Sequence, residues 1–452
     1  MSLSDSTAPA IAPPPPRFVD AFRFWLKLGF ISFGGPAGQI AVMHQELVEK
    51  RRWLSERRFL HGLNYCMVLP GPEAQQHATY IGWLMHGTWG GIVAGGLFVL
   101  PSLLILILLS WLYVSFAELT LVAGIFSGIK PAVTAIVLHA CYRIGSRALK
   151  NSWHVAITAG AFVALFAFDA PFPLVVAIAA VTGYLGGRLA PSQFQYTTGH
   201  RSDKSYGPAV LDDDTPLPAH TQFRWTRLAR TVIVCVALWA LPMFTLFTLF
   251  GWQGTLTQMA WFFTKAAFLT FGGAYAVLPY VYQGAVEQFH WLSGRQMIDG
   301  LALGETTPGP LIMVVAFVGF LGGAQSELFA GDKPLLAGAI AACVVTWFTF
   351  LPSFLFIFAG APLIEKTKDE LHFTAPLAAI TAALVGVILN LALFFAWHVF
   401  WPQGFAGALD WPSLLIALLA ATALFRFKWG VIRVIAASAA LGLVITLITP
   451  IV

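Results

Sequence analysis

The stretch "LALGETTPGPLIMVV", residues 301–315, places a glutamate, two threonines and a Pro-Gly-Pro triplet inside an otherwise apolar run. Proline lacks the N–H that a helix interior needs, so a helix that enters this stretch has to end or kink there. The whole chain of 452 residues is 58% hydrophobic and 10% charged, whereas an ordinary soluble domain is about 25% charged. The sequence therefore predicts an all-α polytopic membrane protein with helices interrupted by Gly and Pro.

The interruption belongs to a long internal repeat. "FGG" at 33–35 returns at 271–273, and "PGP" at 70–72 returns at 308–310, both with an offset of 271 − 33 = 238 residues. Such self-similarity predicts two homologous halves. We expect the following division: 1–20 a disordered cytoplasmic tail, 21–190 the first transport repeat, 191–230 a polar cytoplasmic linker, 231–250 an extra transmembrane span, and 251–452 the second transport repeat.

Charge predicts how the halves are oriented. The loop after the first FGG holds five basic residues between 50 and 58, whereas its counterpart in the second half keeps only Arg295. Because cytoplasmic loops collect Lys and Arg, the two loops are expected on opposite sides of the membrane. The span at 231–250 would invert the second copy, which gives an inverted repeat. The N-terminus is then inside and the C-terminus outside.

Hydropathy predicts about nine full spans and four shorter segments. The expected full spans are 89–114, 119–142, 153–168, 171–187, 231–250, 335–359, 375–397, 411–425 and 430–449. The segments that carry FGG and PGP are 21–43, 61–83, 259–281 and 299–321. We expect these four to be re-entrant or broken half-helices, and the alternative is that all of them cross, which gives 13 crossings.

The paired breaks predict an interior binding site for an anion. Non-helical backbone at membrane depth is tolerated only where protein or water surrounds it. The half-helix that follows each break presents free N–H groups and the positive end of its dipole. Packing kinks between transmembrane helices are the alternative. The substrate-binding candidates at the breaks are Gly34, Gly35, Pro70, Gly71, Pro72, Gln76, Gly272, Gly273, Thr306, Thr307, Pro308, Gly309 and Pro310.

Basic residues that recur in both halves are further candidates. Lys27 and Lys265 each precede FGG by six residues. Either could supply positive charge to the anion, or could extend from a helix end to the membrane surface. Arg57 and Arg295 also correspond, and they suit a gate on the access route or a role in topology. The motif "SGRQ" at 293–296 predicts a capping box for the helix that follows it.

Three ionisable residues near the breaks are candidates for proton coupling. Glu305 precedes the second PGP in an apolar segment, and its alternative role is a hydrogen-bonded structural group. Glu73 and His77 follow the first PGP on one helical face, where Glu73 could instead stabilise the helix N-terminus. Weaker candidates, more typical of helix–helix contacts, are Asn64, Lys130, His139 and Asn390.

No motif indicates a cofactor or a metal. The four cysteines are isolated, and there is no C-x-x-C, H-E-x-x-H, G-x-G-x-x-G or G-x-S-x-G. The sequence therefore predicts no disulfide, metal site or cofactor, and it argues against an intramembrane enzyme. The basic residues serve topology, so no nucleic-acid partner is expected.

Several long motifs resemble those of a known family. "FISFGGPAGQIAVMH" (30–44), "LPGPEAQQHATYIGW" (69–83) and "WLSGRQMIDGLALGETTPGPLIMVVAFVGF" (291–320) look like signatures of the chromate ion transporters, in their long form of two homologous halves. The resemblance implies a bacterial inner-membrane protein that exports chromate, confers chromate resistance and is coupled to protons. Its expected partners are chromate, protons and the lipid bilayer, with a homodimer left open. Sulfate or another tetrahedral oxyanion is the alternative substrate.

Overall fold

The protein is almost entirely helical. The computed structural model describes residues 12–33, 35–116, 119–194, 206–216, 218–326, 333–365 and 374–448. In these ranges the extended structure is limited to one isolated bridge, between Leu54 and Leu211. The elements are α1 (Phe18–Ile31), α2 (Gly35–His44), η1 (Gln45–Lys50), α3 (Glu56–Val68), α4 (Glu73–Phe116), α5 (Thr120–Ala148), α6 (Ser152–Phe168), α7 (Phe172–Leu189), α8 (Pro191–Phe194), η2 (Ala219–Thr221), α9 (Trp225–Phe250), α10 (Thr255–Leu269), α11 (Ala274–Tyr282), η3 (Gln283–Gln288), α12 (Gly294–Thr306), η4 (Leu311–Met313), α13 (Val314–Ala324), α14 (Pro334–Ile364), α15 (Thr374–Phe400), α16 (Trp411–Phe425) and α17 (Val431–Ile448).

Each of the nine predicted spans coincides with a helix, and the prediction of an all-α protein is confirmed for the described residues. Seven of these helices are at least 18 residues long and apolar enough to cross a membrane. The other two, α6 and α16, are apolar but shorter, with 17 and 15 residues. The predicted tail, 1–20, overlaps the structure only in part: residues 1–11 lie outside the described ranges, and α1 already begins at Phe18.

The four predicted breaks all interrupt helices. FGG separates α1 from α2 and α10 from α11, and PGP separates α3 from α4 and α12 from η4. Five glycines at these points have positive φ, which costs glycine little because it has no Cβ. They are Gly35 (71°), Gly71 (130°), Gly272 (70°), Gly273 (98°) and Gly309 (99°).

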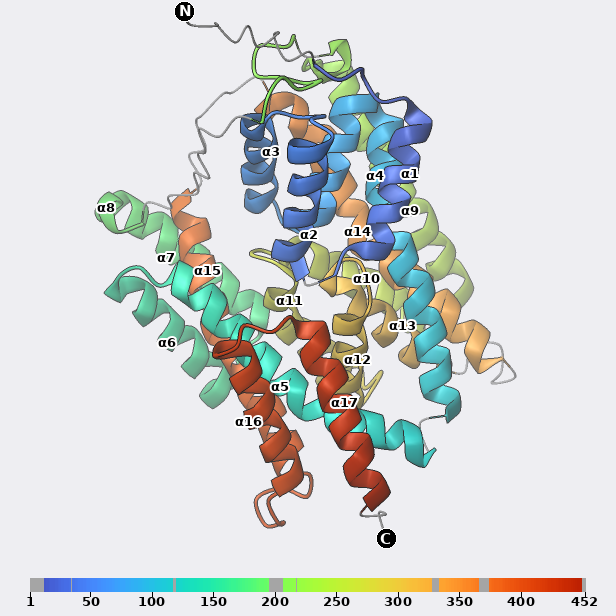
Figure 1. Cartoon of the computed structure of the whole chain (residues 1–452), viewed down its shortest axis with the longest axis vertical. Coiled ribbons are helices and arrows are strands. Elements are labelled where there is room, and N and C mark those ends of the chain that lie inside the picture. Colours follow the sequence, from blue (N-terminus) through green and yellow to red (C-terminus); the bar gives the residue numbers. More distant parts are fainter. Residues whose placement is uncertain are drawn as a thin grey trace, which may run out of the picture.

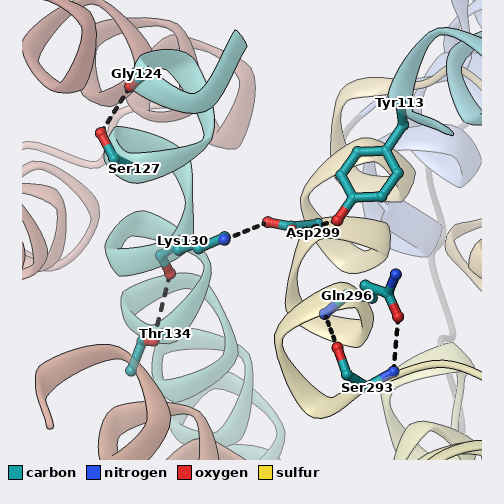
Figure 2. Close-up of polar contacts among 8 residues, drawn as sticks. All are labelled: Tyr113, Gly124, Ser127, Lys130, Thr134, Ser293, Gln296 and Asp299. Carbon is teal, nitrogen blue, oxygen red and sulfur yellow. Dashed lines mark hydrogen bonds and ion pairs between the residues drawn. The ribbon is translucent and has the colours of Figure 1, made fainter. Parts of the chain in front are cut away.

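The two halves repeat in backbone detail. α3 begins at residue 56 and α12 at 294, and the π-helical turns η1 and η3 begin at 45 and 283, so both pairs keep the offset of 238. Arg52 and its counterpart His290 have nearly the same unusual φ, 49° and 53°. The capping box predicted at 293–296 is present at the start of α12, and Figure 2 shows it. These matches support two homologous halves, whereas their inverted orientation in the membrane stays a prediction.

One helix is longer than predicted. The span expected at 89–114 is the second part of α4, which begins at Glu73 directly after PGP and bends at His86 and Gly87. Gly87 has φ 66° and ψ −157°, a combination that is available essentially to glycine. In the second half, α13 and α14 are instead separated between 324 and 334, where the sequence has an insertion. A bend within one helix of the first half thus corresponds to the separation of α13 from α14 in the second.

The packing joins the two halves. In Figure 1, α1, α2 and α3 lie in the upper part of the molecule and α11, α12 and α13 in the middle and lower part, while α4 and α14 pack against each other. Ile357 and Ala361, late in α14, belong to the apolar core of the first half. Val99 and Leu106, in α4, belong to a second apolar core, which joins α5, α6 and α7 of the first half to helices of the second half. Both cores therefore contain residues from the two halves.

Candidate functional site

The breaks of one half are hydrogen-bonded to the breaks of the other. The Gly71 N–H donates to the Thr270 carbonyl at 2.6 Å, and the Gly309 N–H donates to the Ser32 carbonyl at 2.8 Å. Since 71 + 238 = 309 and 32 + 238 = 270, these two bonds are the same interaction with the halves exchanged. Each PGP therefore crosses the residue that precedes FGG in the other half, and we call these two points the Gly71 crossing and the Gly309 crossing.

The serines of the repeated "LPS" motif line both crossings. A Cβ built on Gly71 would lie 2.6 Å from Ser353 Oγ, and one built on Gly309 would lie 2.8 Å from Ser102 Cβ. Neither position has room for a side chain, and both have a positive φ. The hydroxyl oxygen of Ser102 is buried and makes no hydrogen bond among the described residues. Small polar side chains therefore lie directly against buried glycine backbone at both crossings.

Two glutamines add polar contacts at the crossings. Gln39 Nε2 donates to the Gly309 carbonyl at 2.5 Å and also lies 3.4 Å from the Ser32 carbonyl, so it connects the halves at the Gly309 crossing. Gln76 Nε2 donates to the Pro70 carbonyl at 2.7 Å, within its own half. The side-chain amide oxygen of each glutamine is buried without a hydrogen-bond partner among the described residues. These groups are available to water or to a ligand.

Glu305 lies next to the Gly309 crossing. It is 8% exposed, and its carboxylate accepts a hydrogen bond from the hydroxyl of Tyr275, which lies two residues after Gly273. A carboxyl group buried in a membrane helix is costly and is typical of a functional site. The predicted ligands Thr306 and Thr307 instead donate their hydroxyl hydrogens to carbonyls of their own helix, at Leu303 and Gly304.

The predicted polar face after the first PGP is largely inside the protein. The His77 side chain is fully buried, with its ring edge-on to Phe59 at 4.5 Å and parallel to Tyr80 at 6.3 Å between centroids. The Tyr80 hydroxyl donates to Glu365 near the end of α14. Glu73, at the first position of α4, is half-buried. The stripe therefore faces the packed interior rather than lipid.

The repeated lysines lie away from the crossings. Lys27 is exposed on α1 and Lys265 is exposed on α10, where its ammonium nitrogen lies 5.9 Å from the centroid of the Trp261 ring. This placement favours the alternative role, in which both side chains extend to the membrane surface. Gly34, another predicted ligand, lies outside the described residues.

The two predicted gate arginines differ in their surroundings. Arg57 is exposed, and the neighbouring Arg58 donates to the carbonyls of Asp212 and Thr215 in the linker, at 2.7 and 2.6 Å. Arg295 is also exposed, and it donates to the Pro402 carbonyl at 2.6 Å. Arg295 additionally lines a cavity of about 270 Å³.

This polar cavity lies between α4, α5, α12, α15 and α16. On its wall, Lys130 Nζ lies 3.3 Å from Asp299 Oδ1, and the Tyr113 hydroxyl donates to Asp299 Oδ2 at 2.8 Å (Figure 2). The sequence-based prediction named Lys130 only as a weaker candidate and did not include Asp299. The available signal was a single carboxylate in the apolar stretch "MIDGLAL", at the position that corresponds to His61 in the first half.

A larger cavity, of about 570 Å³, lies between α4, α9 and α14. Its lining is mostly apolar, with Arg227 and Arg230 as its charged members. An anion without its hydration shell has few partners there, so the crossings and the polar cavity are the better candidates for an anion site.

Comparison with known proteins agrees with this arrangement. The sequence model of the family described as "Chromate transporter" matches residues 19–184 and 257–443, one stretch in each half. The chain belongs to the chromate transporter family. It is 32% identical to the chromate transport protein of Pseudomonas aeruginosa over 435 residues, which are 94% of this chain and 91% of that protein. It is 29% identical to the chromate transport protein of Cupriavidus metallidurans over 425 residues, 93% and 91% of the two chains.

No solved structure matches the chain. Membership of a transporter family, together with seven long apolar helices, makes it a multi-pass membrane protein. The relatives that match it over most of its length are named as transport proteins, which agrees with the prediction that the chain is not an enzyme.

Proposed function

We propose that this protein is a secondary transporter of the bacterial inner membrane that exports the chromate dianion and thereby confers chromate resistance. Its family membership supports chromate as the substrate class. The observation that carries the proposal is the pair of crossings, at which broken helices from both halves meet in the interior of the protein. Broken helices at the interface of two repeats are typical of the substrate sites of secondary transporters.

The chemistry of the crossings suits an oxyanion. η4 and α11 begin directly after breaks and have no side-chain cap, so backbone N–H groups of their first turns are available. Such N–H groups and the positive end of the helix dipole favour a negatively charged ligand. The glycines at the breaks let the ligand approach the backbone closely. A tetrahedral dianion accepts hydrogen bonds in several directions and can therefore use donors from both halves.

The membrane potential favours the proposed direction. A negative-inside potential moves a dianion outward with about 4.6 kcal/mol per 100 mV, twice the value for a single charge. Export therefore needs no proton for thermodynamic reasons. We assign proton coupling to Glu305, because its buried carboxylate lies beside the Gly309 crossing and is held by the Tyr275 hydroxyl. A proton there would change the charge next to the anion path.

Chromate uptake into inside-out membrane vesicles tests the function. Vesicles that contain the protein should take up labelled chromate in a saturable manner, and uptake should increase when the membrane is energised. Gly160→Ala serves as a matched control for substitutions at the crossings, because a Cβ on Gly160 would contact nothing within 4 Å. Uptake no greater than in empty vesicles would refute the proposal.

Competition identifies the preferred oxyanion. Sulfate has the same charge and shape as chromate, so the crossings alone do not separate the two. Unlabelled sulfate added in excess should leave most chromate uptake intact if chromate is the preferred substrate. If sulfate inhibits uptake more strongly than unlabelled chromate at the same concentration, the result would favour the alternative, a transporter of sulfate or another tetrahedral oxyanion.

A further inference from the structure

The ion pair in the polar cavity has unequal exposure. The Asp299 side chain is 4% exposed and the Lys130 side chain is 30% exposed. One carboxylate oxygen of Asp299 accepts from the Tyr113 hydroxyl, and the other faces Lys130 alone among the described residues. Both residues therefore line the cavity wall, and the lysine is much the more exposed of the two.

A purely structural role explains this pair poorly. Removing two charges from water costs several kcal/mol per ion, and apolar residues often replace a buried ion pair without loss of stability. Ionisable groups within membrane helices usually mark a functional site. Here the pair borders a cavity of about 270 Å³, several times the roughly 30 Å³ that one water molecule occupies in the liquid.

The cavity collects groups that suit an anion. Arg295 and Lys130 supply positive charge, whereas the hydroxyls of Ser127 and Ser413, also on the wall, donate to the Gly124 carbonyl and to Asp410. The hydrogen bond from Arg295 to the Pro402 carbonyl uses one guanidinium nitrogen. Because a guanidinium has five N–H donors, the side chain can also donate to a ligand. These side chains come from α5, α12 and α16, so the cavity is built by elements of both halves.

We propose that Lys130 and Arg295 bind a tetrahedral dianion in this cavity, and that Asp299 is the counter-ion that holds Lys130 until the anion displaces it. This inference rests on the proposed function, since the same dianion would pass this point. Tyr113 keeps its bond to Asp299 when Lys130 turns to the anion. In the predicted topology the cavity lies on the outer side, where α4 and α15 end and α5 and α16 begin.

The exchange of partners links anion binding to protonation. A protonated Asp299 no longer attracts Lys130 as a carboxylate does, so acid conditions should favour anion binding, and anion binding should favour protonation. The other ionisable groups that line the cavity are Tyr113, Arg295, His398 and Asp410. α13, η4 and α17 also pack against α12. α13 and η4 contain no ionisable residue, and the ionisable residue of α17, Arg433, is exposed.

Asp410 provides a matched control. It lines the same cavity, but its two carboxylate oxygens accept from the backbone N–H and the hydroxyl of Ser413 at the start of α16, at 3.0 and 2.8 Å. Asparagine caps helices about as well as aspartate. Asp410→Asn therefore removes the same charge from the cavity as Asp299→Asn without freeing Lys130.

The test is equilibrium binding of labelled chromate and labelled sulfate to the full-length protein purified in detergent, at several pH values. Asp299→Asn should tighten binding roughly 5-fold or more, the lower end of typical coupling between sites, and should flatten its pH dependence. Asp410→Asn should change affinity less than twofold. Lys130→Met should abolish binding in this cavity, and Lys130→Arg should retain it. Thermal unfolding of each variant checks that it is folded.

The outcomes separate this inference from the proposed function. If the ion pair is only structural, Asp299→Asn and Lys130→Met should each lower the stability of the protein without changing its affinity for the anion. The double variant should then recover the lost stability. That result would overturn the inference while wild-type chromate transport still supports the function. Binding that responds to Asp299→Asn as expected, in a protein that transports no chromate, would support the inference and refute the function.

Discussion

Gly309→Ala tests how tightly the Gly309 crossing is packed. The added Cβ would lie 2.8 Å from Ser102 Cβ and 3.3 Å from the Phe98 carbonyl oxygen, at a residue with φ 99°. An unfavourable backbone conformation costs about 1–3 kcal/mol, and overpacking a filled site costs typically 1–3 kcal/mol more. We therefore expect the variant to lose about 2–6 kcal/mol of unfolding free energy. Transport should fall with it, because the Gly309 N–H can no longer reach Ser32.

The identity of the clashing atom allows a sharper test. The nearest atom to the new methyl group is Ser102 Cβ, which Ser102→Ala keeps and Ser102→Gly removes. A double-mutant cycle measured by unfolding in detergent should therefore show that Ser102→Gly restores part of the loss. The stability regained through Ser102→Gly would be smaller by roughly 0.5–1 kcal/mol, since glycine destabilises a helix interior. Equal recovery by Ser102→Ala, or an unchanged stability of Gly309→Ala itself, would refute the packing that we describe.

Three further predictions concern charged residues. Glu305→Gln should give transport that no longer depends on pH, and uptake whose pH profile matches that of the wild type would remove Glu305 from the coupling role. Lys27→Ala and Lys265→Ala should change chromate uptake less than about twofold, because both side chains are exposed; a tenfold loss would place them at the site. Arg58→Ala should increase limited proteolysis within the linker, because three hydrogen bonds to linker carbonyls are lost. Arg57→Ala, on an exposed neighbour, should leave the cleavage rate unchanged.

The helices and their breaks could be predicted because they depend on local chemistry. Apolar length determines which segments suit a membrane, and Gly and Pro determine where a helix has to stop. The repeat added independent support, since the same pattern occurs twice with one offset. The ends of α6 and α16 agree with the predicted spans 153–168 and 411–425 to within one residue. The bend at Gly87 was not predicted, because it depends on how neighbouring elements pack.

The side chains at the site were harder to predict. Lys27 and Lys265 have the expected charge, but their exposure depends on which face of the helix meets its neighbours. Lys130 and Asp299 are 169 residues apart, 299 − 130, so no local pattern connects them. The approach of Ser102 to Gly309 likewise joins the two halves. In each case the contact that decides the role is tertiary, and it cannot be inferred from a single sequence without the fold.

Gln39 makes the two crossings unequal. It connects the halves at the Gly309 crossing, whereas its counterpart at the Gly71 crossing is Val277, which has no polar side-chain atom. A typical net hydrogen bond contributes about 1 kcal/mol, which changes the ratio of two populations roughly fivefold. If the two crossings open alternately during transport, the protein at rest favours the state in which the Gly309 crossing is closed. Two similar halves thus give a transporter with a built-in resting side, and one amide side chain sets that preference.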